Sequence, residues 1–238
     1  MGALKPETAF SGFSRKTISF IKGVERNNDQ EWFEAHRSEY DEHYVAPARA
    51  FVEAIGPGLQ KLRPRIGFNP DHNGKGSIKK IFTDRRFNPD RDPYKPWLDI
   101  MFWEGPLKAK KDNSVLALRL EPQRLTYFGG VKHMDRPVLK AYRETVLEQG
   151  AELEAELKKV LKDKAVTMCA PGYARLPRGV DPEHPQSGLL LHDAMFVYKS
   201  IKTPEELYSS GFVEFSLQQF KEFVSLHGWL AAMLNERL

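Results

Sequence analysis

The sequence lacks most of the features that would assign it to a special class of protein. Its 238 residues include a single cysteine, Cys169, which excludes an internal disulfide and a zinc site built on several thiolates. No base stands beside Cys169 in the sequence, so we expect it to be buried as a small hydrophobe. No apolar run approaches the roughly 20 residues that cross a bilayer, and residues 1–14 lack the apolar stretch of a signal peptide. We therefore expect a cytoplasmic protein with no membrane partner.

Motifs that bind cofactors are also missing. The sequence contains neither the glycine-rich dinucleotide fingerprint nor the P-loop pattern. Its seven histidines include no H-x-x-x-H or H-E-x-x-H pair. We expect no bound metal, flavin or nucleotide; if a metal were present, Asp181, His184 and His192 would be the first residues to consider.

Neither sign of charge dominates the composition. The 36 Lys and Arg residues oppose 32 Asp and Glu, for a net charge of +4, which falls short of the dense positive surface of a dedicated nucleic-acid binder. Two short basic runs, Arg85-Arg86 and Lys108–Lys111, lie near aromatic residues. A nucleic acid is therefore an alternative partner, less favoured than a small anion.

Apolar residues recur with helical spacing near both ends of the chain and with strand spacing in its middle. The predicted helices are Ser14–Asn27, Asp29–Ile55 and Phe212–Leu234, with a further helix beginning at Asp135, and the predicted strands are Trp97–Trp103, Ser114–Leu120 and Leu125–Phe128. Helices, then strands, then helices predict an α+β fold with a central antiparallel sheet packed by N- and C-terminal helices. Because no Ser/Gly-rich linker interrupts the pattern, we expect one domain over residues 13–238, preceded by a disordered or loosely attached segment, residues 1–12.

The densest polar segment is Thr83–Lys95. It carries four cations and three carboxylates, with two prolines that stiffen the backbone. The planar fork of an arginine suits bidentate binding of a carboxylate or phosphate, and a lysine adds a point charge. The alternative is that these charges neutralise one another on a solvated loop, where ion pairs are weak.

Four motifs, in order along the chain, resemble a widespread family of conserved hypothetical proteins that is catalogued only as a domain of unknown function. They are Asn27–Phe33, similar to N-N-x-x-W-F; Asp84–Lys95, similar to D-x-R-F-x-x-D-K-x-P-Y-K; Gly129-Gly130 followed by Pro137 and Arg143; and Pro177–Pro185, which reads P-x-G-x-D-x-x-H-P. The resemblance extends from about Phe13 to Leu234, although Thr83 stands where the family usually has Arg, and Arg91 where it has Lys. It implies a fold and a set of motifs, but no reaction.

These residues lead us to expect a site for phosphate, sulfate or a carboxylate. The expected ligand-binding residues are Arg86, Lys95, Arg143, Gly129 and Gly130; Asp84 or Asp90 would orient the cations, and Tyr94 or Tyr127 would form a wall. This site requires the loop before Trp97 and the end of Leu125–Phe128 to lie at the same end of the sheet, with the amides of the helix that begins at Asp135 close by. Three functions stay open: a small-molecule binder or enzyme acting on an anionic ligand, a nucleic-acid binder, and a protein whose polar motifs only stabilise the fold.

Overall fold

A computed structural model of the protein describes residues 9–72, 74–86 and 88–238, and the chain forms two compact units. The first comprises Met1–Met101, Leu118–Thr126 and Ile201–Gln218, and the second Phe102–Ala117, Tyr127–Ser200 and Gln219–Leu238. Residues 1–8 of the predicted N-terminal segment lie outside the described residues. Phe10 is buried and its ring packs edge-on against Phe13 and Phe51.

A five-stranded antiparallel sheet contributes strands to both units, in the order β1-β2-β3-β5-β4. The strands are β1 (Leu98–Glu104), β2 (Ser114–Glu121), β3 (Arg124–Val131), β4 (Val166–Met168) and β5 (Met195–Lys202). The β1-β2-β3 meander confirms the three predicted strands, and β4 pairs with β5 so that Thr167 stands opposite Tyr198. The α+β class with an antiparallel sheet is thus confirmed.

The first unit begins with helices whose predicted starts, at Ser14 and Asp29, are confirmed by N-terminal caps. The side chain of Ser14 accepts from the Thr17 amide at the start of α1 (Arg15–Arg26), and that of Asp29 accepts from the Trp32 amide at the start of α2 (Gln30–Ala35). The predicted continuous helix Asp29–Ile55 is wrong, because the chain continues as α3 (Arg37–Glu39), a π-helical turn η1 (Tyr40–Val45) and α4 (Ala46–Leu62). The interruption falls at His36, which leaves helical geometry and stacks its ring on Trp32 at 4.1 Å.

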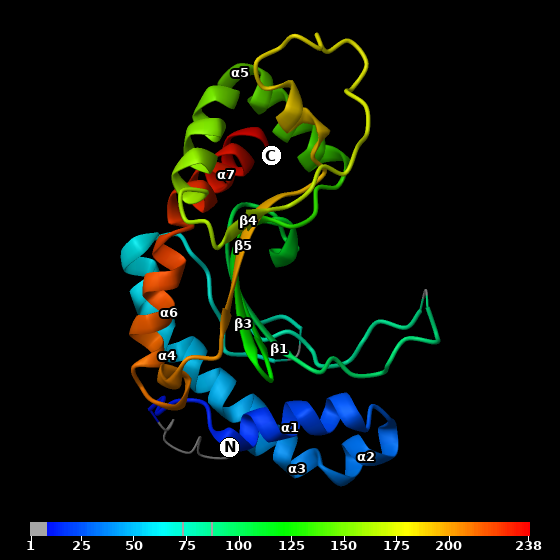
Figure 1. The fold of residues 1–238 in the computed structure, drawn as a ribbon, viewed down its shortest axis with the longest axis vertical. Coiled ribbons are helices and arrows are strands. Elements are labelled where there is room, and N and C mark those ends of the chain that lie inside the picture. Colours follow the sequence, from blue (N-terminus) through cyan, green and yellow to red (C-terminus); the bar gives the residue numbers. More distant parts are fainter. Residues whose placement is uncertain (1–8, 73, 87) are drawn as a thin grey trace. The chain divides into compact units, whose positions relative to one another are not determined.

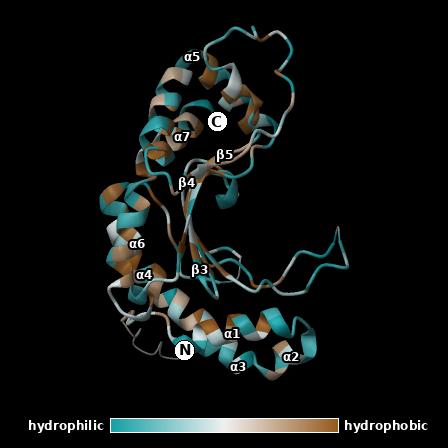
Figure 2. Cartoon of the chain, in the orientation of Figure 1, coloured by the Kyte–Doolittle hydropathy of each residue, from teal (hydrophilic) through white to brown (hydrophobic). Residues whose placement is uncertain are grey.

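Aromatic packing fixes α4 against α6 (Phe212–Lys221) in the first unit (Figure 1). The rings of Phe51 and Phe212 lie 5.2 Å apart. At Gly58, a Cβ atom would come within 2.6 Å of a methyl group of Leu217, so a larger residue would require the leucine side chain to move. Figure 2 shows hydrophobic and hydrophilic residues on both helices, as expected for elements that bury one face.

The second unit pairs α5 (Arg136–Val160) with α7 (Val224–Arg237), which pack together (Figure 1). The carboxylate of Asp135 accepts from the Val138 amide, which confirms the predicted start of α5. The predicted helix Phe212–Leu234 is interrupted between α6 and α7, where the amide of Phe223 turns back to the carbonyl of Phe220 at 2.9 Å. Both rings are fully buried, and the ring of Phe220 meets those of Phe102 and Tyr127 edge-on, so packing sets the break.

No helix in the described part of the chain combines the length and apolar character needed to cross a membrane.

Candidate functional site

The predicted polar loop forms a hydrophilic hairpin in the first unit, visible as the extended segment in Figures 1 and 2. At its stem the amide of Thr83 donates to the carbonyl of Pro93 at 2.8 Å. Arg86 forms a bidentate pair with Asp84, with N···O distances of 2.6 and 2.9 Å, and its side chain is 79% exposed. These hydrogen bonds lower the pKa of Asp84 to about 2. Asp90 is exposed, and Phe87 lies outside the described residues. An ion pair this exposed contributes little to stability.

Two of the family-like motifs meet where this hairpin joins the first unit. The side-chain amide of Asn28 donates to the carbonyl of Tyr94 at 2.8 Å, and its oxygen accepts from the Tyr94 amide at 2.9 Å. The ring of Tyr94 stacks on that of Phe33 with the centroids 4.2 Å apart, and burial raises the pKa of its phenol. Asn28, Phe33 and Tyr94 therefore act as a clamp that holds the hairpin, and the role of Tyr94 as a pocket wall stays a prediction.

Lys95 follows this clamp and is half-buried. Its ammonium donates to the carbonyl of Lys80 at 2.8 Å, and burial lowers its pKa. Close by in the first unit, a group that the sequence analysis did not identify occupies β1 and β2: Arg119 forms a bidentate pair with Asp99 at 2.7 and 2.9 Å and lies over the ring of Trp97. Strand alternation alone could have suggested it, since Asp99 and Arg119 are charged residues among buried neighbours.

The remaining predicted site residues belong to the second unit. Tyr127 is completely buried against Phe220. A Cβ atom at Gly129 would lie 2.5 Å from Phe223, and one at Gly130, whose φ is +127°, would lie 2.3 Å from the carbonyl oxygen of Met195. The two glycines thus permit close packing of β3.

The expected geometry of the site was wrong in one respect. β1 and β3 run in the same direction because β2 is antiparallel to both, so the start of β1 and the end of β3 mark opposite ends of the meander. The Asp84–Lys95 loop precedes β1 and Gly129-Gly130 lies near the end of β3. Binding of an anion by Arg86 or Lys95 stays a prediction.

Arg143, on α5, is the predicted cation with the most distinctive surroundings. Its guanidinium lies over the ring of Tyr173 at 4.9 Å, and its Nε atom is buried with no hydrogen-bond partner among the described residues. A buried donor without a partner costs about 1–3 kcal/mol, and more when it is charged. Such an atom calls for a further group that it can bind.

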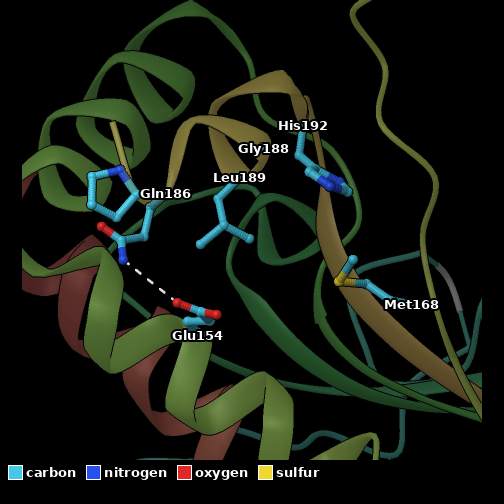
Figure 3. A pocket seen from close by; sticks show the side chains of 7 residues that line it. Glu154, Met168, Gln186, Gly188, Leu189 and His192 are labelled. Atoms are coloured by element: carbon cyan, nitrogen blue, oxygen red, sulfur yellow. Dashed lines mark hydrogen bonds between the residues drawn. The ribbon is translucent and has the colours of Figure 1, made fainter. Parts of the chain in front are cut away.

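The second unit also holds a pocket of about 340 Å³ (Figure 3). It is lined by Glu154, Met168, Pro185, Gln186, Gly188, Leu189 and His192. The hydroxyl of Tyr142 donates to the carbonyl of Leu189, and the amide of Tyr173 donates to the carbonyl of Leu191. These two bonds attach the surroundings of Arg143 to the 3₁₀ turn η3 (Ser187–Leu191) that forms one side of the pocket.

Of the polar side chains that line this pocket, that of His192 is the most deeply buried, with 2% of its surface exposed. Its Nδ1 atom lies 3.8 Å from the sulfur of Cys169, which donates to the carbonyl of Ala194 and accepts from the Phe196 amide. Burial lowers the pKa of His192 and raises that of Cys169, so the pair is neutral at pH 7. Cys169 is buried, as predicted, and the fold brings His192 next to it from 23 residues away in the sequence.

The other wall of the pocket carries Glu154 on α5. Gln186 donates to it at 3.5 Å (Figure 3) and Lys158 pairs with it at 2.8 Å, and both interactions lower its pKa. Within the described residues no group of three or more His, Cys, Asp or Glu side chains is arranged to hold a metal ion. His184 is not among the residues that line the pocket. Its Nδ1 atom accepts a hydrogen bond from the Gln186 amide at 3.2 Å.

The comparisons with known proteins identify a family without naming a reaction. No curated protein matches the chain. One family model matches residues 16–229, which is most of the 238-residue chain and includes every motif on which the resemblance rests. The chain therefore belongs to the family of conserved hypothetical proteins designated DUF2461.

Proposed function

We propose that the protein binds a small organic anion, a carboxylate or a phosphate, in the second unit, with its anionic group on Arg143 and its body in the pocket that η3 borders. The observation that carries this proposal is the buried Nε atom of Arg143, which has no hydrogen-bond partner among the described residues. An oxyanion is the natural acceptor for a guanidinium donor, and such charge-assisted bonds are about twice as strong as neutral ones.

The pocket itself indicates the rest of the ligand. Its volume of about 340 Å³ is at the lower end of the range for small-molecule sites. Met168, Pro185 and Leu189 supply apolar walls, which favour a ligand with a compact hydrophobic body. His192 is neutral because burial lowers its pKa. It therefore offers the ligand one polar contact and adds no charge to the pocket. Glu154 is held by Lys158 and Gln186, so its negative charge is partly compensated.

This proposal moves the cationic centre away from the Arg/Lys/Asp hairpin. The charges of Asp84 and Arg86 already neutralise each other in an exposed pair, whereas Arg143 is half-buried and its Nε atom has no hydrogen-bond partner among the described residues. A ligand-binding role of this kind fits the expected cytoplasmic location, and it leaves open whether the bound anion also reacts.

Thermal unfolding in sodium benzoate and in sodium phosphate, each compared with sodium chloride at the same ionic strength, tests the proposal. Benzoate combines a carboxylate with a compact apolar ring, so we expect it to raise the melting temperature in a saturable way. Arg143→Gln removes the charge while keeping a donor, and should weaken benzoate binding by about 10- to 100-fold, the equivalent of one charge-assisted hydrogen bond.

The matched control is Lys140→Gln, which removes one positive charge from the same helix at an exposed position. It should leave benzoate binding unchanged. Equal weakening by both variants would show that the anion responds only to the overall charge of the protein. If neither anion stabilises the wild type, the proposal is refuted. Because Arg143→Gln also removes an unpaired buried donor, the variant should be at least as stable as the wild type without ligand.

A further inference from the structure

One face of the sheet in the second unit carries a row of aromatic rings that the anion pocket does not use. Phe102, Tyr127 and Gly129 point to the helical side, where they meet Phe220 and Phe223. Because side chains alternate along a strand, Trp103 of β1 and Phe128 of β3 point to the opposite face. Both are half-buried. Tyr127 and Gly129, the two neighbours of Phe128 in the sequence, are buried.

β5 continues this row, since Phe196 and Tyr198 alternate with the fully buried Met195 and Val197. The ring of Tyr198 lies 6.2 Å from that of Phe128 and 6.4 Å from that of Phe196. Neighbouring strands are about 4.8 Å apart, so rings on β1, β3 and β5 span about 14 Å across three strand intervals. We name Trp103, Phe128, Phe196 and Tyr198 the aromatic face.

Lysine ammonium groups cover these rings. The Nζ atom of Lys132 lies 3.9 Å from the centroid of Phe128 and 5.4 Å from that of Phe196, and Lys110 lies 3.9 Å above Trp103. Lys110 belongs to the basic run Lys108–Lys111, which also carries Lys111 beside Asp112. A lysine head group is strongly hydrated and sits on a flexible stem, so it can move aside and contact an anion close to the ring.

We infer that the aromatic face binds single-stranded nucleic acid. Every base has a π-face that stacks on an aromatic side chain, and the lysines over Trp103, Phe128 and Phe196 match the phosphates that accompany the bases. The row of rings is longer than one base, which favours an extended strand over a mononucleotide. A base paired inside a duplex cannot present its face to the rings, so the geometry selects single strands.

Fluorescence anisotropy with a labelled oligothymidylate of about 20 nucleotides tests this inference, with an oligouridylate of the same length as a second probe. We expect binding at about 50 mM NaCl that weakens steeply by about 200 mM. The double variant Phe196→Leu/Tyr198→Leu keeps apolar bulk but removes two stacking surfaces, and should weaken binding by roughly 25-fold or more. Phe82→Leu is the matched control: it removes an exposed ring from the first unit and should have no effect.

A second pair of variants separates local contacts from overall charge. Lys132→Gln and Lys140→Gln each remove one positive charge, but only Lys132 lies over the aromatic face. Lys132→Gln should weaken binding by a larger factor and reduce the salt dependence by about one phosphate contact. Circular dichroism confirms that each variant is folded before its binding is interpreted.

Several outcomes would overturn the inference. Equal affinity for a duplex of the same length would show binding by charge alone. Binding to vesicles containing phosphatidylserine, with none to either oligonucleotide, would assign the face to a lipid surface. A dimer that Phe196→Leu/Tyr198→Leu converts to a monomer, with no nucleic-acid binding by the wild type, would assign it to a second copy of the chain. None of these results depends on benzoate binding, so the two proposals fail independently.

Discussion

Replacing Asn28 by alanine should destabilise the first unit strongly, although Asn28 itself is only half-buried. Its amide group donates to the carbonyl of Tyr94 and accepts from the Tyr94 amide. Tyr94 is 5% exposed, so the substitution leaves two backbone groups with little access to water. The variant also loosens the stacking of Tyr94 on Phe33, because the clamp holds the backbone from which that ring projects.

The size of the effect follows from the two lost bonds. An unsatisfied buried polar group costs about 1–3 kcal/mol, and partial access of water to the half-buried site favours the lower half of that range. Two such groups give a loss of about 2–4 kcal/mol in the free energy of unfolding. For a chain of this size that corresponds to a fall of about 4–16 °C in melting temperature.

Urea unfolding, followed by far-ultraviolet circular dichroism, measures this loss for Asn28→Ala and for Asn27→Ala. Asn27 is the control: its side chain makes one exposed hydrogen bond, to the carbonyl of Gly23 at 3.1 Å, so its replacement should cost about 0.5 kcal/mol. Separate unfolding transitions of the two units would assign the loss to the first. Stabilities of the two variants within 0.5 kcal/mol of each other, about the limit of such measurements, would refute the clamp.

Three further predictions concern the second unit. Gly130→Ala should lower the free energy of unfolding by on the order of 3 kcal/mol or more, because the new Cβ would lie 2.3 Å from the Met195 carbonyl oxygen at a positive φ. Gly188→Ala should be nearly neutral, because the space around its Cβ position is open. Equal falls in melting temperature for the two variants would contradict the packing argument. Burial lowers the pKa of His192 in the folded chain, so below about pH 6.5 the unfolded chain binds a proton that the folded chain does not. The free energy of unfolding should therefore decline as pH falls below about 6.5. His192→Asn should show a shallower decline, and an unchanged decline would assign the effect to another group. Burial raises the pKa of the Cys169 thiol, so the thiol should react with a disulfide reagent at pH 8 far more slowly in the native protein than in urea; rapid native labelling would contradict its burial.

Local signals explain which parts of the fold were predictable. Ser14, Asp29 and Asp135 cap their helices as expected because a cap is set by the residue and its next three neighbours. The turn at Pro122-Gln123 joins β2 and β3 for a similar reason. Long-range packing decided the rest: β5 joins β3 across more than 60 residues, and no local pattern indicates that pairing.

The same distinction applies to the candidate site. The sequence identified Arg143 as a cation of interest, but not the pocket of the second unit, which combines residues from α5, β4 and η3. It also missed His192 as the neighbour of Cys169, because 23 residues separate them. The expected single site failed on strand direction, a property that the sequence implied once the meander was predicted.

The clamp changes how variants in the family-like motifs should be interpreted. The hairpin that carries Asp84, Arg86 and Asp90 is exposed and hydrophilic, so it buries too little apolar surface to fix its own position. Asn28, Phe33 and Tyr94 compensate by holding its stem. A substitution in the N-N-x-x-W-F or P-Y-K segment therefore acts first on stability, and any loss of function it causes must be compared with its loss of folded protein. A substitution at Arg143 instead removes an Nε donor that has no hydrogen-bond partner among the described residues, so a functional loss there at unchanged stability would identify the binding site directly.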